Sequence, residues 1–331
     1  MTQPYTSNFF RDQQRGSRQS AKRVLPLIIA ATKPNTAIDV GCGVGTWLGV
    51  LAESGVTDIW GIDGDYVDRT LLQIPQERFL PHDLTRPIDL KRSFDLVLCL
   101  EVAEHLPADS APTLVDSLVR LGPVILFSAA IPFQGGTSHV NEQWPEYWAG
   151  HFSRKNHIPV DYIRRQIWHS PDVEWFYAQN ILLFVERAYL ESNSLLLRES
   201  ESTPSTPLSL VHPVKYLELV FELRLSQEIA ELVPATDAFI LVDDFGIEIP
   251  GRKGSPFLER DGMYWGKPAN DDEAIREFER MRRAGFAFVI FTWHSFWWLD
   301  YYIGFYQYLR SRFQCVRKND CVLAFDLRST V

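Results

Sequence analysis

Three glycines stand at alternate positions in one short segment of the sequence, at Gly41, Gly43 and Gly45. The segment follows an apolar run that begins at Ala37 and precedes an amphipathic stretch, so it predicts a turn between a strand and a helix. Glycine allows unusual backbone dihedrals and lets a ligand come close, while the following helix offers free N–H groups. The pattern is typical of a loop that cradles a nucleotide-like ligand.

Two kinds of nucleotide-binding turn compete for this segment. The dinucleotide fingerprint requires a third glycine at position 46, where this chain has Thr46. The segment Asp39–Gly45 instead resembles motif I of class I S-adenosylmethionine (SAM)-dependent methyltransferases, of the small-molecule type 11 and type 23 kind. Three later segments follow in the order used by that family, namely Trp60–Asp63, His82–Leu84 and Phe94–Pro107. The resemblance covers about residues 5–187.

The resemblance implies that the cofactor is SAM and that the glycines, with Cys42 between them, cradle it. It implies that Asp63 accepts hydrogen bonds from the ribose, because two adjacent hydroxyls can donate to one carboxylate. Asp65 is the alternative if the second strand ends two residues later. Asp83, followed by Leu84, is expected to accept from the adenine amino group.

Two further acids have open roles. In the resembled family, a carboxylate at the position of Asp39 orients the turn and reaches toward the methionine moiety, although loop amides could equally satisfy it. Glu101 ends the fourth predicted strand, so it could help to hold the ligand or could cap the next helix.

The segment from Phe133 to Trp148 follows the fifth predicted strand, so we expect it at the same carboxyl edge as the glycine turn. His139 is the candidate general base for a hydroxyl acceptor, with Glu142 holding its tautomer. His105 is the rival base. Trp144, Tyr147 and Trp148 could stack on a sugar or other ring-shaped acceptor or pack in the core. We expect no metal, because His151, His157 and His169 show no metal-type spacing with carboxylates and methyl transfer needs none.

The elements that must position these residues alternate along the first part of the chain. A helical pattern over Ala21–Ala31 precedes strand-like runs, with helical patterns between most of them. The runs are Ala37–Val40, Asp58–Ile62, Phe94–Leu100, Val124–Ala129 and Asn180–Val185. This alternation predicts an α/β, Rossmann-like doubly wound, mostly parallel sheet with helices on both faces.

A composition change divides the chain. The segment 191–213 is rich in Ser, Thr and Pro without an apolar period, so we expect a linker between a methyltransferase domain at 1–190 and a smaller α/β domain at 214–331. Part of the later segment, including Asp271–Gly285 and Phe296–Asp300, is similar to uncharacterised modules attached to bacterial glycan-modifying enzymes.

Composition narrows the class of partner. The net charge of −9 offers no broad basic surface, so nucleic acid is not an expected partner. The start lacks a signal-peptide pattern and no run is long enough to span a membrane, so we expect a cytoplasmic protein. Four scattered cysteines predict no disulfide framework.

The leading hypothesis is a SAM-dependent transfer of a methyl group to an oxygen of a sugar, a glycan precursor or another small polar acceptor. The alternatives are a non-catalytic module that retains SAM or S-adenosylhomocysteine (SAH) and an NAD-dependent oxidoreductase. The oligomeric state does not follow from the sequence.

Overall fold

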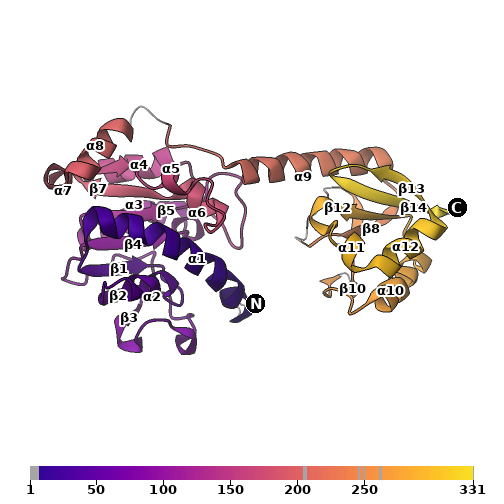
Figure 1. Cartoon of the computed structure of the whole chain (residues 1–331), viewed down its shortest axis with the longest axis horizontal. Coiled ribbons are helices and arrows are strands. Elements are labelled where there is room, and N and C mark those ends of the chain that lie inside the picture. The colour runs from indigo at the N-terminus through magenta and orange to yellow at the C-terminus, as the bar shows by residue number, and fades with distance from the viewer. Residues whose placement is uncertain are drawn as a thin grey trace. The chain divides into compact units, whose positions relative to one another are not determined.

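The computed structural model describes residues 7–203, 207–244, 247, 249, 251–260 and 263–330, and within these ranges it describes the side chains of residues 16–329. Two compact units divide between Lys215 and Tyr216, inside helix α9 (Pro213–Leu232). Each unit is built on its own sheet (Figure 1).

The first unit contains a seven-stranded sheet in the order β3-β2-β1-β4-β5-β7-β6. Its strands are β1 (Thr36–Val40), β2 (Asp58–Asp63), β3 (Phe79–Pro81), β4 (Leu96–Leu100), β5 (Val124–Ser128), β6 (His157–Val160) and β7 (Leu182–Glu186). The five strands β3, β2, β1, β4 and β5 are parallel, and β7 pairs antiparallel with both β5 and β6. The predicted doubly wound, mostly parallel sheet is therefore confirmed. The antiparallel β7 between β5 and β6 distinguishes it from the usual dinucleotide-binding order 3-2-1-4-5-6.

Both faces of this sheet are buried, which explains why its central strands are continuous apolar runs rather than alternating ones. In β4, Leu96 and Leu98 pack into one core cluster while Val97 and Cys99 pack into the other, as the period of two requires.

Helices from different parts of the chain cover the two faces. The first cluster takes in residues of α1 (Ser7–Thr32), α2 (Thr46–Glu53), α5 (Arg164–Ile167), α6 (Trp175–Asn180), α7 (Arg187–Ser192) and α8 (Ser194–Ser202). The second takes in residues of α3 (Ala111–Leu121) and α4 (Pro145–Ser153). Short 3-10 turns lie at Arg69–Leu71, Gln76–Arg78, Ala103–His105 and Ala108–Ser110.

Part of the predicted linker, residues 191–213, forms a helix. Helix α8 occupies Ser194–Ser202, and its Leu196 is fully buried in the first core cluster. Thr203 accepts a hydrogen bond from the backbone N–H of Asp161 at 3.1 Å, which fastens the end of α8 to the sheet unit. The first unit therefore extends beyond the predicted boundary at residue 190.

The second unit has a five-stranded sheet in the order β13-β14-β12-β8-β9 and a two-stranded sheet of β10 and β11. These strands are β8 (Ala238–Val242), β9 (Lys253–Pro256), β10 (Glu259–Arg260), β11 (Met263–Tyr264), β12 (Phe288–Thr292), β13 (Phe313–Lys318) and β14 (Val322–Thr330). Besides α9, its helices are α10 (Asp271–Arg283), α11 (Trp298–Tyr301) and α12 (Ile303–Arg312), with a 3-10 turn at Trp293–Ser295. Acids in the first turn of α10 and arginines in its last turn both suit the helix dipole. The second α/β unit expected from the sequence is present.

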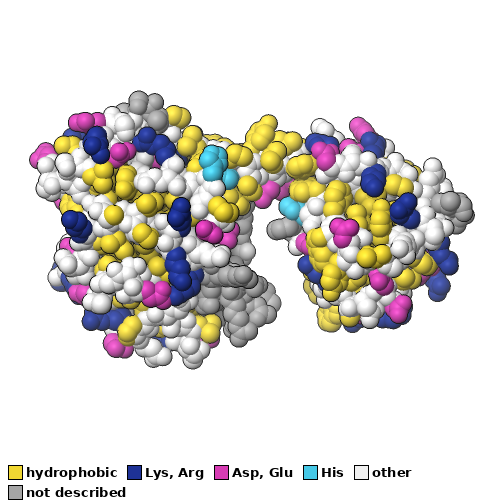
Figure 2. Space-filling view, in the orientation of Figure 1, with side chains coloured by type: hydrophobic (Ala, Val, Ile, Leu, Met, Phe, Trp, Pro, Cys, Tyr) yellow, Lys and Arg dark blue, Asp and Glu magenta, His cyan; other side chains and the backbone are white. Residues whose placement is uncertain are grey.

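Acidic and basic side chains are interspersed over each unit on the face shown in Figure 2. Ion pairs among the described residues include Arg78 with Asp58 at 3.0 Å and Arg328 with Asp237 at 2.8 Å. No helix of the described residues is long and apolar enough to cross a membrane.

Candidate functional site

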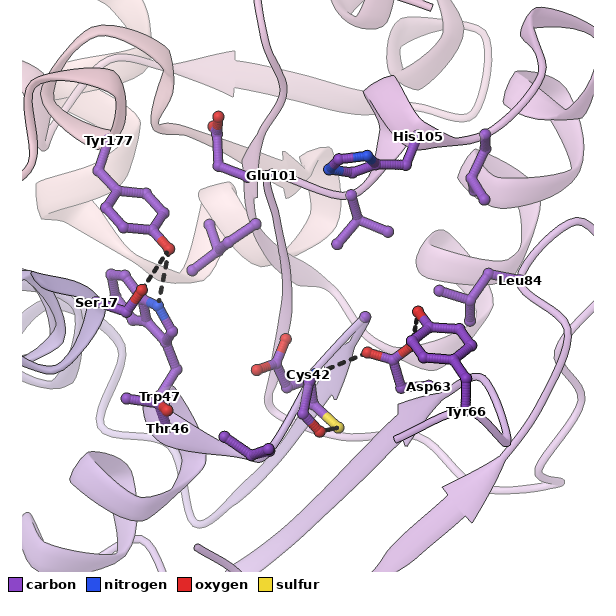
Figure 3. Close-up of a pocket in the computed structure, with 17 residues that line it drawn as sticks. Ser17, Cys42, Thr46, Trp47, Asp63, Tyr66, Leu84, Glu101, His105 and Tyr177 are labelled. Carbon is purple, nitrogen blue, oxygen red and sulfur yellow. Dashed lines mark hydrogen bonds between the residues drawn. The ribbon is translucent and has the colours of Figure 1, made fainter. Parts of the chain in front are cut away.

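A pocket lies in the first unit at the carboxyl edge of the parallel strands. Strands β1, β2 and β4 end beside it, because parallel strands bring their carboxyl ends to one edge. Its described lining residues are Ser17, Asp39, Gly41, Cys42, Gly43, Val44, Thr46, Trp47, Asp63, Tyr66, Leu84, Leu100, Glu101, Val102, His105, Leu106 and Tyr177 (Figure 3). The structure thus brings together most of the residues predicted to hold the cofactor.

The glycine turn is built as the sequence predicts. Gly41, Gly43 and Gly45 have φ values of 84°, 52° and 81°, in the left-handed region that favours glycine. The backbone N–H groups of Gly41 and Cys42 donate to the carbonyl of Ile62 at 2.8 and 3.1 Å, which ties the turn to the neighbouring strand. A Cβ at residue 41 would lie 2.2 Å from Val102, so this position also lacks room for a side chain.

Asp63, at the end of β2, holds the glycine turn in place through a hydrogen bond. Its carboxylate accepts from the backbone N–H of Gly43 at 2.7 Å, the N–H of Gly64 at 2.6 Å and the hydroxyl of Tyr66 at 2.6 Å. Burial raises the pKa of Asp63, and these three hydrogen bonds oppose that rise. By contrast, the side chain of Asp65 is 83% exposed and pairs with Arg69, so Asp63 is the acid at the pocket.

Asp39 lies inside β1 and is 3% exposed. Burial, followed by the nearby charge of Asp63, raises the pKa of Asp39 to about 7. The same environment raises the pKa of the Cys42 thiol, chiefly through burial, so that thiol stays neutral. No arginine or lysine is among the described residues that line this pocket. The acids Asp39, Asp63 and Glu101 are therefore not offset by a lysine or arginine of the described lining.

Asp83 and Leu84 follow β3, and the structure separates them. Leu84 lines the pocket, while Asp83 borders an adjoining cavity that also includes Asp63 and Leu84. The Asp83 carboxylate accepts from the backbone N–H and hydroxyl of Thr85 at 3.0 and 2.7 Å. These bonds lower the pKa of Asp83 and keep it charged at the rim of the site.

Glu101 follows β4 and lines the pocket. Its backbone φ is 52°. Its carboxylate accepts from Asn180 at 3.1 Å and from Gln134 at 3.2 Å. Burial raises the pKa of Glu101. Glu104, one 3-10 turn later, has a pKa well above its usual range because it is buried and because Glu101 is close.

The proposed base and its partner meet as the sequence suggests, but outside the pocket lining. Nδ1 of His139 lies 2.9 Å from Oε1 of Glu142, and Glu142 also accepts from the backbone N–H groups of Phe133 and Gly135, both at 2.7 Å. His105 lines the pocket, and its ring centroid lies 4.8 Å from that of His139. Burial and the neighbouring His139 lower the pKa of His105.

Sequence reasoning missed a polar group on the opposite wall. The hydroxyl of Tyr177 lies 3.3 Å from Oγ of Ser17 and accepts from the indole N–H of Trp47 at 3.4 Å (Figure 3). Burial raises the pKa of Tyr177 further above its ordinary value. These residues come from α6, α1 and α2, so no local pattern in the sequence marks them as neighbours. Trp148, a candidate stacking residue, is instead 2% exposed and packs against Phe127 in the core.

A doubly wound sheet with a glycine turn and strand-end acids at its carboxyl edge places the first unit among nucleotide-binding α/β enzymes. Residues 10–167 match the family model described as a methyltransferase domain. The first unit therefore contains a methyltransferase domain, built on the mostly parallel α/β sheet described above.

Solved structures similar to this chain include a magnesium protoporphyrin IX methyltransferase from Synechocystis with bound SAH. It is 20% identical, with 54% of this chain and 87% of that chain covered and a TM-score of 0.41. A sugar N-methyltransferase from Streptoalloteichus is 16% identical, with 56% and 95% covered and a TM-score of 0.43. A search of curated proteins gave no match to the sequence.

Proposed function

We propose that the anionic pocket is the SAM site and that the protein methylates an oxygen of a small polar acceptor, of the sugar or glycan-precursor class. The observation that carries the first part is the charge of the pocket. Asp39, Asp63 and Glu101 are carboxylates in its lining, and no described lysine or arginine faces them there. SAM brings a sulfonium and an ammonium group, whereas a dinucleotide would bring two phosphates. Buried carboxylates attract the first ligand and repel the second.

Each residue predicted to hold the cofactor has a role in this proposal. Gly41 and Gly43 in the pocket lining, with Gly45 next in the same turn, let the backbone approach the cofactor, and Cys42 and Leu84 form apolar contacts beside it. Asp39 and Glu101 face the methionine and sulfonium end. Asp63 accepts from the ribose, and Asp83 accepts from the adenine at the rim.

Ribose binding at Asp63 has a structural consequence for Tyr66. The Tyr66 hydroxyl occupies Oδ1 of Asp63 at 2.6 Å, so a ribose hydroxyl must compete with it. We expect Asp63→Asn to weaken SAM binding by at least about tenfold, since a charge-assisted hydrogen bond contributes about 1.5–3 kcal/mol. Tyr66→Phe is the matched control, because it frees the same oxygen without removing the carboxylate. Calorimetric titration with SAM tests both variants. Unchanged affinity in Asp63→Asn would refute the ribose role of Asp63.

The oxygen acceptor is supported by the imidazole and carboxylate groups beside the pocket. A hydroxyl must lose a proton to attack the methyl carbon, and the His139–Glu142 pair with His105 supplies groups suited to handling that proton. The carbohydrate class rests on the similarity of the C-terminal segment to modules attached to glycan-modifying enzymes. Isotopically labelled SAM incubated with carbohydrate fractions tests it. Label in an acid-stable, base-stable methyl ether is the expected product, and label in an amine or ester would redirect the proposal.

A non-catalytic module that retains SAM or SAH is the second candidate. Such a module binds SAM with the Asp63 dependence given above but yields no labelled product with any fraction. The cytoplasmic location expected from the sequence stays a prediction that fractionation of cells can test.

A further inference from the structure

Three potential metal ligands meet beside the cofactor pocket. Glu104 and His105 belong to the 3-10 turn after β4, and His139 belongs to the segment after β5. One ligand atom from each of the three side chains lies within 4.8 Å of the other two. Residues that are 34 positions apart in sequence therefore form one compact cluster, with His105 also lining the pocket.

Glu104 lacks the partner that a buried carboxylate needs. The residue is 0% exposed, and neither of its carboxylate oxygens has a hydrogen-bond partner of acceptable geometry among the described residues. Burying a carboxylate without a hydrogen-bond donor or a cation is costly, so buried charges are ordinarily paired or coordinate a metal. The neighbouring Glu101 can share a proton with Glu104, but as an acid it brings no compensating positive charge.

The two imidazoles are already oriented by groups outside the cluster. Glu142 holds Nδ1 of His139 at 2.9 Å, and the backbone of Ser138 forms a hydrogen bond with His105. Carboxylates and backbone carbonyls hold the second ring nitrogen of metal-bound histidines in the same way. The supporting segment is itself fastened to the turn, because the N–H groups of Val140 and Asn141 donate to the carbonyl of Glu104 at 2.8 and 3.0 Å.

We infer that Glu104, His105 and His139 bind a divalent transition-metal ion such as Zn²⁺ or Mn²⁺ at the acceptor side of the SAM pocket. Two imidazole nitrogens and one carboxylate oxygen suit these ions, whereas Mg²⁺ and Ca²⁺ prefer sites made of oxygen atoms. Three protein ligands leave coordination positions open for an acceptor. This inference departs from the sequence expectation that the protein holds no metal.

The metal would serve the methyl transfer, and in this respect the inference rests on the proposed function. A metal held by Glu104, His105 and His139 would act as a Lewis acid that lowers the pKa of an acceptor hydroxyl, whose proton would leave to solvent. The oxygen then attacks the methyl carbon, the carbon–sulfur bond breaks, and the electron pair of that bond stays on sulfur as SAH. His139 acts here as a metal ligand, with Glu142 as its positioning residue, instead of accepting the proton itself.

Metal binding is tested on the full chain without an activity assay. Protein stripped with a chelator is titrated with Zn²⁺, Mn²⁺ and Mg²⁺ by calorimetry, and Co²⁺ loading is followed by its visible absorption. We expect one Zn²⁺ or Mn²⁺ per chain, no comparable Mg²⁺ binding, and loss of this site in His105→Asn and Glu104→Gln. Glu142→Gln is expected to weaken metal binding by about 10- to 100-fold, as removal of an outer partner does.

His169→Ala is the matched control, because His169 is an exposed histidine outside the cluster. It is expected to bind one ion with unchanged affinity. Absence of stoichiometric binding, or equal binding by wild type, His105→Asn and Glu104→Gln, would overturn the inference. Circular dichroism of the same metal-free samples shows whether the variants are folded, and a SAM titration of the metal-free wild type separates the two proposals. Loss of SAM binding in the wild type refutes the proposed function, whereas loss of metal binding alone refutes the metal site.

Discussion

Asp39 is a pocket residue whose protonation state changes near neutral pH. It lies in a strand interior, where the nearby charge of Asp63 adds to the effect of burial on its pKa. Its pKa of about 7 means that near neutral pH the empty site holds a mixture of protonated and ionised Asp39. A cationic ligand favours the ionised form. SAM binding must therefore release a proton when the pH is below 7.

We predict that SAM affinity falls as the pH is lowered from about 8 to about 5, with Asp39 contributing up to about tenfold per pH unit below its pKa. The sign follows because protonation removes the charge that the ligand needs. Calorimetry in buffers of different ionisation enthalpy measures the protons released. Asp39→Asn should release about one proton fewer than wild type at pH 6. An identical proton count in the two proteins would show that Asp39 does not face the cation.

The sequence predicted those site residues that lie close to one strand end. The glycine turn and Asp63 are found from spacing because each follows directly after an apolar strand, and strand ends meet at one sheet edge. Tyr177 and Ser17 could not be found in this way, since they are 160 positions apart and approach each other through helix packing. The sequence shows that Glu104 and His139 are ionisable residues. It does not show that they lie close together, because this depends on how the segment after β5 folds back.

At the scale of elements, the turn after β1 is constrained both by its backbone conformation and by the lack of space for a side chain. A comparison of two glycines distinguishes these effects. Gly41 and Gly55 both have left-handed φ values, of 84° and 96°. A Cβ at Gly41 would lie 2.2 Å from Val102, whereas a Cβ at Gly55 has no neighbouring atom within 4 Å.

We predict that Gly55→Ala costs about 1–2 kcal/mol of stability, from backbone strain alone, and leaves SAM affinity unchanged. Gly41→Ala should cost more than this and abolish SAM binding, because Val102 and the turn must move apart. Thermal unfolding and SAM titration of the two variants make the comparison. Equal losses of stability with SAM binding kept in both variants would contradict the tight packing of the turn.

Helix α8 was missed because its sequence has the composition of a linker. It is rich in Ser and Glu, and among its described residues Leu196 is the one that is fully buried. One buried leucine in a helix of nine residues gives too weak a period to detect. The neighbouring Leu197 is 37% exposed and provides a natural comparison.

We predict that Leu196→Ala lowers the free energy of unfolding of the first unit by about 2–5 kcal/mol, as for a fully buried leucine. Leu197→Ala should change it by no more than about 0.5 kcal/mol. Urea unfolding of both variants measures the difference. If the two substitutions have the same small effect, the segment behaves as the linker that its composition suggested.

At the scale of the whole molecule, the two units have separate hydrophobic cores. The clusters around the seven-stranded sheet use residues before α9, whereas Leu225 and Ile229 of α9 pack with β8, β12 and β14 in the second unit. Because each unit has its own hydrophobic core, we expect the first unit to fold without the second.

We predict that a fragment ending at His212, just before α9, folds and binds SAM with the affinity of the full chain. The cut retains the bond from the backbone N–H of His212 to Gln179 at 2.7 Å, which links the end of the fragment to the polar network around Glu101. Circular dichroism and SAM titration of this fragment provide the check. A fragment that folds yet binds SAM far more weakly would show that the second unit contributes to the cofactor site.

The central claim, that the pocket at the carboxyl edge of the first sheet binds SAM, is tested most directly by calorimetry of the intact protein with SAM, SAH and NAD. The predicted result is one SAM per chain, displaced by SAH, with no binding of NAD. Binding of NAD with no response to SAM or SAH would contradict the claim.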